Sequence, residues 1–389
     1  MTRVFTCGVG MTAFGKQPGR GLRSMALEAI GEAVRDSGLD QSRIERIYFG
    51  NAIAPTVVQQ DMIKGQVALR EHDLGKLPLM NVENACASGG SAFLMAVEAV
   101  ASGCVDVALA VGVEQMHHAD KSRAFNALRG STDVEDICEY VPGQVSANSL
   151  LMDFYAGVAQ EYLAGSDAEP RDFAAVAVKN RDHASHNPLA QLRKPQTIEE
   201  VLHGRMIVPP LTLAMCSPMT DGAAAAIVCS EKVVAELGID RIHVRACQMA
   251  SGAGGAPVDD ASRKAYDFAS LGPDDFDLLE LHDAAAPAEL MQYHEIGLCP
   301  KGEGFRLVRD GSTTLGGRIP VNCSGGLLSR GHALGATGLA QIYELVLQLR
   351  GRAQGRQVEG ARLAMSINGG GWLDGTYALA IATILEKQG

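Results

Sequence analysis

The fold is decided by the stretch PLMNVENACASGGSAFLMAVEAVASGCVDVALAVGV, residues 78–113. It predicts a strand over residues 78–82, a turn of small residues over 85–90, a buried helix through Phe93 and Val100, and a second strand over 105–113. Strands that alternate with helices of this length favour parallel sheets covered by helices on both faces. The stretch therefore predicts an α/β fold.

The same order of elements returns in the C-terminal half of the chain. Each half offers a helix, two strands, a glycine-rich turn, a buried helix and a last strand. We therefore expect a duplicated fold with halves at residues 1–250 and 251–389. The matching helices and strands are 24–37, 44–49, 78–82, 93–100 and 105–113 in the first half, and 261–270, 276–281, 318–323, 334–350 and 362–367 in the second.

Residues from about 116 to 212 do not fit this repeat. The stretch is richer in charge, and Pro188, Pro209 and Pro210 break its periodicity. We expect an inserted loop domain that lies over the first half of the protein. Such excursions commonly carry substrate contacts.

The charge balance argues against a nucleic-acid partner. The chain has 389 residues with 34 Lys+Arg and 45 Asp+Glu, a formal net charge of -11, and an acidic chain repels a phosphate backbone. No stretch approaches the roughly 18 consecutive apolar residues of a membrane span. The N-terminus enters a short apolar run without the hydrophobic core of a signal peptide. We expect a cytoplasmic protein without membrane contact.

The nine cysteines show neither a CxxC pair nor the Cys/His spacing of a metal site. Most of them are expected to be reduced thiols that pack in the core as small hydrophobic side chains. We therefore expect no bound metal.

Cys86 is the first candidate for catalysis, because it lies where a strand turns into a helix. At a helix N-terminus, the unpaired N–H groups and the helix dipole favour the thiolate, which is the nucleophilic form. The alternative is a structural thiol buried in a tight turn.

Three further segments place polar groups at predicted turns. His332 lies in a glycine-rich turn, where it can act as a base toward a ligand, or else cap a helix or lie on the surface. His282 and Asp283 end a strand, where α/β proteins bind ligands, although they can also cap the next helix. Residues 368–371 (NGGG) offer N–H groups for an oxyanion, unless they only form a turn. Four such segments at the ends of equivalent strands are far more specific than any one of them.

Together these segments resemble the signature loops of thiolases. The resemblance rests on residues 84–89 (NACASG), 216–225 (CSPMTDGAAA), 331–338 (GHALGATG) and 368–371 (NGGG), which follow one another in the family's order. His282-Asp283 resembles the His-Asp motif of the sterol-carrier-protein-type and archaeal thiolases. The resemblance implies two stacked α/β halves in αβαβα layers with an inserted loop domain. It also implies at least a homodimer, coenzyme A as co-substrate and no tightly bound cofactor.

The resemblance also implies roles for individual residues. Cys86 would be acylated by the thioester, and His332 would activate it and then help to hold the thioester oxygen. His282 would complete that oxyanion hole, directly or through water. The N–H groups of Cys86 and Gly370 would form a second hole, and Ser217 would contact the pantetheine arm of coenzyme A.

Three positions depart from the family's pattern. Most thiolases carry a second cysteine in the C-terminal loop, where it moves a proton at the α-carbon, but this chain has Asn368 at that position, or Ile367 or Ser366 if the alignment is shifted. Sterol-carrier-type thiolases can place this cysteine after His-Asp, where this chain has Ala284 and Ala285. The usual proline of the third loop is Ala333. Cys323 is close in sequence but matches no motif, so we assign it no role.

These observations predict an acyl-CoA C-acyltransferase of the thiolase type. It would cleave a 3-oxoacyl-CoA with coenzyme A, or run the reverse condensation, through an acyl group on Cys86. A bulky or aromatic substrate of the benzoylsuccinyl-CoA type is a special case. The alternative is an acyltransferase or retro-aldolase subunit that works with a small zinc-ribbon/OB-fold protein. A non-catalytic lipid carrier or scaffold ranks last, because it gives no reason for Cys86 and His332 to occur together.

Overall fold

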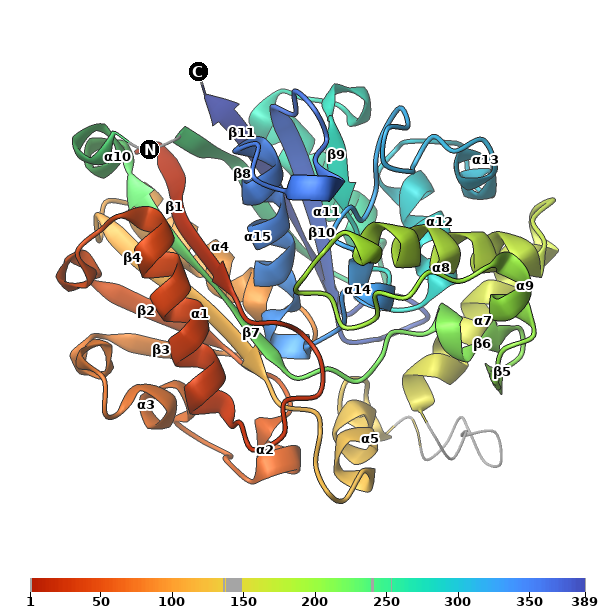
Figure 1. The fold of residues 1–389 in the computed structure, drawn as a ribbon, viewed down its shortest axis with the longest axis horizontal. Helices are drawn as coiled ribbons and strands as arrows, with labels where there is room; N and C mark the ends of the chain where they lie inside the picture. Colours follow the sequence, from red (N-terminus) through yellow and green to blue (C-terminus); the bar gives the residue numbers. More distant parts are fainter. Residues whose placement is uncertain (1, 136, 138–148, 239–240, 253, 389) are drawn as a thin grey trace.

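The computed structural model describes residues 2–135, 137, 149–238, 241–252 and 254–388 (Figure 1). Its main sheet has the strand order β3-β2-β4-β7-β1-β8-β11-β10-β9. The strands are β1 (Val4–Met11), β2 (Arg46–Gly50), β3 (Leu79–Val82), β4 (Val107–Glu114), β7 (Gly222–Ser230), β8 (Arg241–Ser251), β9 (Leu278–Glu280), β10 (Leu363–Gly370) and β11 (Leu379–Gln388).

The sheet is mixed, so the expectation of parallel sheets is only partly correct. Strands β2, β3 and β4 pair in parallel, as do β9 and β10, whereas β7, β1, β8 and β11 pair antiparallel to their neighbours. A parallel pair needs a crossover of a dozen or more residues, and the loop between β10 and β11 is shorter than that. Of the strand predicted over 318–323, Val321 forms an isolated bridge to Leu279 of β9, next to Pro320, which has no N–H to donate.

The two parts of the sheet are held apart by a pair of buried helices. Helices α4 (Ser88–Ala101) and α15 (Thr337–Leu349) pack on each other, with α4 against β2 and β4 and α15 against β10. The parts join where Phe5 and Thr6 of β1 pair with β8. Helix α1 (Leu22–Ser37) covers β1 and β7 from outside, and α11 (Pro257–Ala269) covers β8 and β11. These are the expected αβαβα layers.

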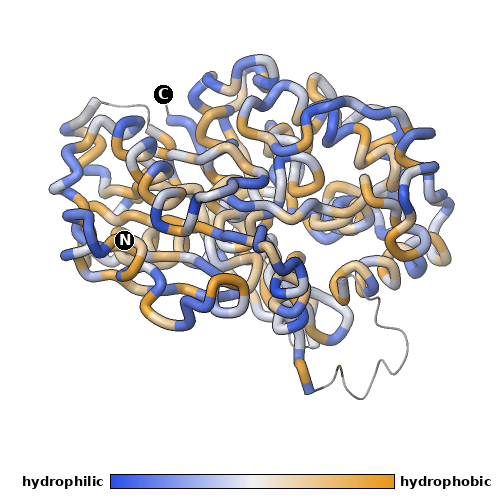
Figure 2. The backbone as a smooth tube through the Cα atoms, turned by 60° about the horizontal axis from the view of Figure 1, so that its bottom comes forward, coloured by the Kyte–Doolittle hydropathy of each residue, from blue (hydrophilic) through white to orange (hydrophobic). Residues whose placement is uncertain are grey.

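The buried helices α4 and α15 are apolar around most of their circumference, as a helix between two sheets must be. The side chains of the two helices share one hydrophobic cluster with residues of both parts of the sheet. The helix residues of this cluster include Phe93 and Val100 of α4, and Leu339 and Leu345 of α15. Figure 2 shows hydrophobic segments gathered in the middle of the molecule and hydrophilic segments around its margin. None of the described helices is long and apolar enough to cross a membrane.

The inserted segment lies mostly against the C-terminal half of the protein, so its predicted position over the first half is only partly correct. Helix α5 (Ser122–Arg129) contacts α2 (Ala54–Val58) of the first half. In contrast, α8 (Pro170–Ser185) contacts α12 (Ala286–Glu295), α13 (Gly304–Arg309) and α14 (Gly326–Ser329), and α7 (Leu150–Ala164) contacts α12. Phe173 and Val176 of α8 are buried in the cluster that contains Leu279 and Leu290. The burial of the apolar face of α8 thus determines where the inserted segment lies. The segment also contains α9 (Ile198–Leu202), β5 (Met206–Val208) and β6 (Leu211–Thr212).

Two of the cysteines differ from the expectation of reduced thiols. Cys7 of β1 and Cys229 of β7, which lie on paired strands, form a disulfide. Six cysteines are free, namely Cys86, Cys104, Cys216, Cys247, Cys299 and Cys323, and Cys138 lies outside the described residues. Of the free cysteines, Cys86, Cys216, Cys247 and Cys323 are buried as expected, whereas Cys104 is exposed and Cys299 is half-buried.

Candidate active site

Cys86 lies in the tight turn that joins β3 to α4. Ala85 before it has a φ of 48°, in the left-handed region, and the Ser88 hydroxyl donates to the Ala85 carbonyl oxygen over 2.7 Å. The backbone N–H of Asn84 in turn donates to the Ser88 hydroxyl over 3.0 Å. These bonds hold the turn that precedes α4 and present a side chain that is 7% exposed.

His332 lies between α14 and α15, after Gly331, whose φ is 114°. Its backbone N–H donates to the Thr220 hydroxyl over 2.9 Å. The Thr337 hydroxyl donates its proton to the Ala333 carbonyl over 3.0 Å and lies 2.7 Å from Nδ1 of His332. Because that proton is already used, Thr337 accepts from Nδ1–H. Nε2 of His332 therefore carries a lone pair, as a base requires.

His282 has the opposite arrangement of hydrogen-bonding groups. Nδ2 of Asn368 lies 3.2 Å from the Cys86 carbonyl oxygen and 3.4 Å from Nδ1 of His282. A carbonyl oxygen only accepts, so the amide nitrogen of Asn368 faces it and also offers an N–H to His282. Nδ1 of His282 therefore accepts, and its proton is on Nε2. His282 presents a hydrogen-bond donor.

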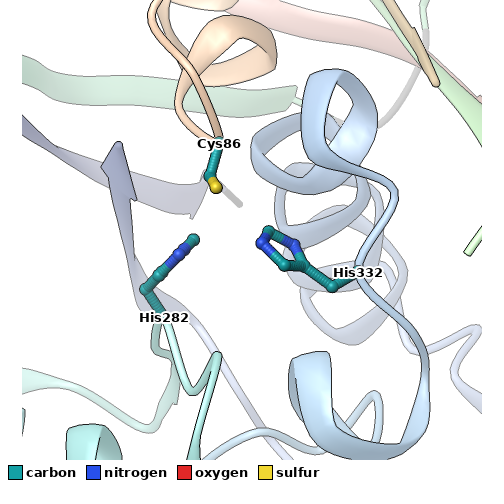
Figure 3. Close-up of side chains that lie close together, drawn as sticks. All are labelled: Cys86, His282 and His332. Atoms are coloured by element: carbon teal, nitrogen blue, oxygen red, sulfur yellow. The ribbon is translucent and has the colours of Figure 1, made fainter. Parts of the chain in front are cut away.

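The three side chains point at a common centre (Figure 3). The Cys86 sulfur and one ring nitrogen from each of His282 and His332 lie within 4.8 Å of one another. The two imidazole rings are edge to face, with centroids 5.3 Å apart. Since Nδ1 of each ring is engaged elsewhere, the Nε2 atoms face the sulfur. A base and an oxyanion donor thus flank one thiol.

A metal ion is the other group that such a cluster can hold. Zinc binds cysteine sulfur and unprotonated histidine nitrogen. In the arrangement above only His332 offers a lone pair, because the Asn368 amide places the proton of His282 on Nε2. The donor set therefore fits acid–base chemistry better than zinc binding.

Burial sets the resting charges of the trio. It raises the pKa of Cys86 to about 12, with a further increase from the nearby Glu114 carboxylate. Burial, followed by the charge of Arg330, lowers the pKa of His332 to about 3. The pKa of His282 is also lowered, mainly by burial and then by His332. The free site thus holds a neutral thiol and neutral imidazoles, and not the thiolate favoured by its helix position.

The trio opens into a cavity with a volume of about 260 Å³. Its walls are mostly apolar or aromatic, and Arg205 is at its rim. Ser217 and Gly370 of the predicted site both line it. Other lining residues are Met116, Phe125, Leu128, Leu151, Met152, Tyr155, Ile207, Leu213, Cys216, Met219, Leu334, Gly371, Trp372 and Tyr377.

The glycines after Asn368 have distinct neighbours. A side chain at Gly370 would overlap the Asn84 carbonyl and Ala87, so Gly370 lets β10 approach the Cys86 turn closely. The backbone N–H groups of Cys86 and Gly371 lower the pKa of the Cys86 thiol, against the effect of burial. Gly371, which the sequence did not single out, is therefore a second donor near the sulfur.

Sequence reasoning missed the aromatic wall and the supporting carboxylates. Tyr155 comes from α7, whereas Trp372 and Tyr377 come from the loop between β10 and β11, and no local pattern connects the helix with the loop. The Glu114 carboxylate accepts N–H groups of Ala52 and Gly335, which ties the Cys86 side of the site to the loop that follows His332. A buried acid at the end of a predicted strand is the one signal that could have identified it.

Asp283 connects the two histidine loops. Its carboxylate accepts the backbone N–H groups of Leu327 and Leu328, at 2.7 and 3.3 Å, and the Asn180 amide at 2.7 Å. The residue that follows His282 therefore holds the start of the turn leading to His332. Burial and the neighbouring Glu289 raise the pKa of Asp283.

Comparison with known proteins agrees with this geometry. The chain is 38% identical to the benzoylsuccinyl-CoA thiolase subunit BbsB of Thauera aromatica, with 95% of both chains covered. It is 37% identical to the acetyl-CoA acetyltransferase of Methanothermobacter thermautotrophicus, with 98% of this chain and 99% of the relative covered. Sterol carrier protein 2 of Oryctolagus cuniculus is 35% identical, with 95% of this chain and 70% of the relative covered.

A solved structure matches over almost the whole chain. A chain of the Ltp2-ChsH2(DUF35) aldolase superposes with a TM-score of 0.79 at 25% identity, covering 99% of this chain and 98% of that one. A model of the thiolase N-terminal domain matches residues 4–200, and a thiolase C-terminal domain-like model matches residues 240–386. The two family models together cover both parts of the sheet. The chain belongs to the thiolase family of acyltransferases.

Proposed function

We propose that the protein cleaves a 3-oxoacyl-CoA with coenzyme A, or runs the reverse condensation, through an acyl group carried on Cys86. The observation that carries this proposal is the pair of Nε2 atoms beside the Cys86 sulfur, one with a lone pair and one with a proton. A thiol nucleophile needs a lone pair that can take its proton, as on Nε2 of His332. A developing thioester oxyanion needs a hydrogen-bond donor, such as Nε2–H of His282.

The neutral resting pair fixes the order of the proton movements. The Cys86 proton passes to Nε2 of His332 as the sulfur attacks the 3-keto carbon, because an unassisted thiolate is disfavoured at this buried position. Nε2–H of His282 then donates to the thioester oxygen, which becomes negative as the carbon–carbon bond breaks. Such a donor stabilises the transition state by about 3 kcal/mol. The N–H groups near the sulfur donate to the second oxyanion, which is the oxygen on the carbon that the sulfur attacks. They come from Cys86 and from Gly370 or Gly371.

The cavity supports a bulky or aromatic acyl group as substrate. Trp372 packs edge-on against Tyr155 and Tyr377, with ring centroids 5.2 and 5.6 Å apart, and aromatic rings prefer such edge contacts. Among the described lining residues, Arg205 is the one lysine or arginine, and it lies at the rim. One relative is named for benzoylsuccinyl-CoA. Ser217, on the same wall, would contact the pantetheine arm.

The second candidate is a subunit of a complex with a small zinc-ribbon/OB-fold protein, acting as an acyltransferase or retro-aldolase. It is favoured by the superposition on an aldolase whose name includes a DUF35 partner. A retro-aldol cleavage needs no cysteine nucleophile, so the arrangement around Cys86 favours the acyltransferase. A lipid carrier ranks last for the same reason. The homodimer, the cytoplasmic location and the division at residue 250 are also part of the proposal.

Intact mass after incubation with acyl-CoA thioesters tests the proposal. We expect wild type to gain one acyl group, and the Cys86→Ala variant to gain none and to lose turnover. Cys323→Ala is the matched control, because Cys323 is buried among residues such as Leu278 and Leu339, away from the cavity lining. An acylated Cys86→Ala protein would reject the covalent mechanism. Full turnover of the purified chain would remove the need for a partner.

A further inference from the structure

The site lacks an assigned group for proton transfer at the α-carbon. Asn368, which stands where most thiolases have a second cysteine, cannot transfer a proton, and its amide orients His282 instead. His282 is then a neutral ring whose Nε2–H is a good hydrogen-bond donor but a poor acid. His332 is occupied with the Cys86 proton. The group must therefore come from elsewhere in the cavity wall.

The remaining titratable groups of the described lining, apart from Arg205, are Tyr155, Tyr377 and Cys216. The Cys216 thiol is directed at the Thr212 carbonyl, 3.5 Å away, and none of its described contacts involves Cys86, His282 or His332. Tyr155 is one step removed, because its hydroxyl donates to the hydroxyl of Tyr377 over 3.3 Å. Tyr377 is next to the reacting groups: its ring is edge-on to the His282 ring, with centroids 5.5 Å apart.

The surroundings of the Tyr377 hydroxyl suit a group that gives up a proton and takes it back. Its proton rests on the His282 carbonyl oxygen, 3.2 Å away. One donor already points at its oxygen, the Tyr155 hydroxyl at 3.3 Å. Nε2 of Gln292 lies 3.4 Å away, but its two N–H groups have closer acceptors in the carbonyl oxygens of His282 and Ala288, at 2.8 and 3.1 Å. The bond from Tyr155 would remain as a hydrogen bond to a phenolate, and bonds to a charged acceptor are the stronger kind.

The glycine motif itself makes room for this ring. A side chain at Gly369 would come within 2.8 Å of two ring carbons of Tyr377. The absence of one lets the ring lie flat on the backbone between Asn368 and Gly370. Residues 368–371 thus position Tyr377 as well as the Cys86 turn. Burial raises the pKa of Tyr377 well above its usual value, so the phenol holds its proton until an enolate forms.

We propose that Tyr377 is the catalytic residue that transfers the proton at the α-carbon, with Tyr155 stabilising its phenolate. This inference rests on the proposed function. In cleavage, the bond between the α-carbon and the 3-keto carbon breaks and its electron pair stays on the α-carbon. The O–H bond of Tyr377 breaks and the new C–H bond forms, which leaves a phenolate.

The second half of the reaction restores every group. The phenolate first takes the proton held by His332, directly or through a water. Neutral His332 then takes the thiol proton of the incoming coenzyme A, whose sulfur attacks the thioester on Cys86, and returns that proton to the departing Cys86 sulfur. No oxidant, reductant or additional acid is needed.

The test separates acylation from proton transfer with two probes. Benzoyl-CoA can acylate Cys86 but has no α-proton, and acetyl-CoA in D₂O reports exchange of its α-protons by NMR. In Tyr377→Phe we expect exchange to fall by at least about 100-fold, while the rate of benzoylation, followed by intact mass, stays within about threefold of wild type. Tyr155→Phe should lose about tenfold in exchange, because the hydroxyl that donates to the phenolate is removed.

Tyr266→Phe is the matched control, because its buried ring lies beside Phe276 and its hydroxyl donates to the Ile296 carbonyl, outside the cavity. Wild-type exchange in Tyr377→Phe would overturn the inference, as would an equal loss of exchange and benzoylation, which would mean a structural role. Benzoylation of wild type without any exchange of acetyl-CoA would overturn it while leaving the acyltransferase proposal intact. A wild-type protein that no thioester acylates would instead refute the proposed function.

Discussion

The side chain of Asn368 bridges the carbonyl oxygen of Cys86 and Nδ1 of His282, at 3.2 and 3.4 Å. One amide therefore positions the Cys86 turn and selects the tautomer of His282. Side chains at Gly90 and Gly338, on the two buried helices, would overlap the Asn368 side chain. The crossing of α4 and α15 thus holds this residue, and the substitution of asparagine for a cysteine has a structural consequence as well as a chemical one.

Asn368→Asp should lower turnover by about 100-fold or more. The carboxylate would face the Cys86 carbonyl without a proton to donate, and it would draw the His282 proton to Nδ1. Nε2 would then lose the hydrogen that the oxyanion needs. Steady-state kinetics on an acyl-CoA substrate measures the loss, and thermal unfolding shows whether the fold persists. A folded variant with near-wild-type turnover would contradict the tautomer assigned to His282.

Thr337→Val should slow acylation of Cys86 by about tenfold. The valine keeps the shape of the side chain but removes the oxygen that accepts Nδ1–H of His332. The histidine then loses the bond that fixes its lone pair toward the sulfur. Stopped-flow acylation measures the rate, and Thr383→Val, whose hydroxyl contacts Cys247, is the control. An equal effect of both substitutions would point to packing, and not to orientation of the base.

The reactivity of Cys86 toward iodoacetamide should rise with pH without reaching a plateau below about pH 10. The pKa of its thiol is raised to about 12, so the thiolate fraction increases about tenfold for each pH unit in this range. Cys86→Ser corrects for alkylation of the other cysteines. Glu114→Gln should increase the rate at a given pH, since it removes a negative charge that disfavours the thiolate. A plateau near pH 7 in wild type would show a preformed ion pair.

Glu114 should make the folded state less stable as the pH rises from about 4.5 to about 7. Burial raises the pKa of this carboxyl from 4.5 to about 7 in the folded protein. A folded-state pKa above the unfolded value means that the folded state favours the protonated form. The contribution of Glu114 to the free energy of unfolding is therefore fully present below pH 4.5. It is lost as the pH rises through 7, which lowers the free energy of unfolding by about 3 kcal/mol.

Chemical denaturation at pH 5 and pH 8 measures this effect. In Glu114→Gln the difference in the free energy of unfolding between the two pH values should shrink, because the amide does not titrate. An unchanged difference would assign the pH dependence to other buried acids, such as Glu280 and Glu295, whose pKa values burial also raises to about 7.

The sequence by itself determined the layers of the fold and the loops that carry the chemistry. Cys86, His282 and His332 each lie where a predicted strand or turn meets a helix, and such junctions are set by local periodicity and small residues. Since equivalent strands end at the same edge of a sheet, the repeat also placed these loops together. That is why the duplicated α/β fold and the meeting of these three loops could be predicted without coordinates, whereas the αβαβα order was an implication of the resemblance to thiolases.

Only the tertiary structure decided what depends on contacts between distant residues. Tyr155 and Tyr377 are 222 positions apart, yet their hydroxyls lie 3.3 Å from each other, and no local pattern predicts such a pair. The proton positions on His282 and His332 follow from Asn368 and Thr337, and the neutral thiol of Cys86 follows from burial that outweighs the favourable helix terminus. Burial and hydrogen-bond partners are properties of the packed molecule, because they arise where segments meet and not within any one of them.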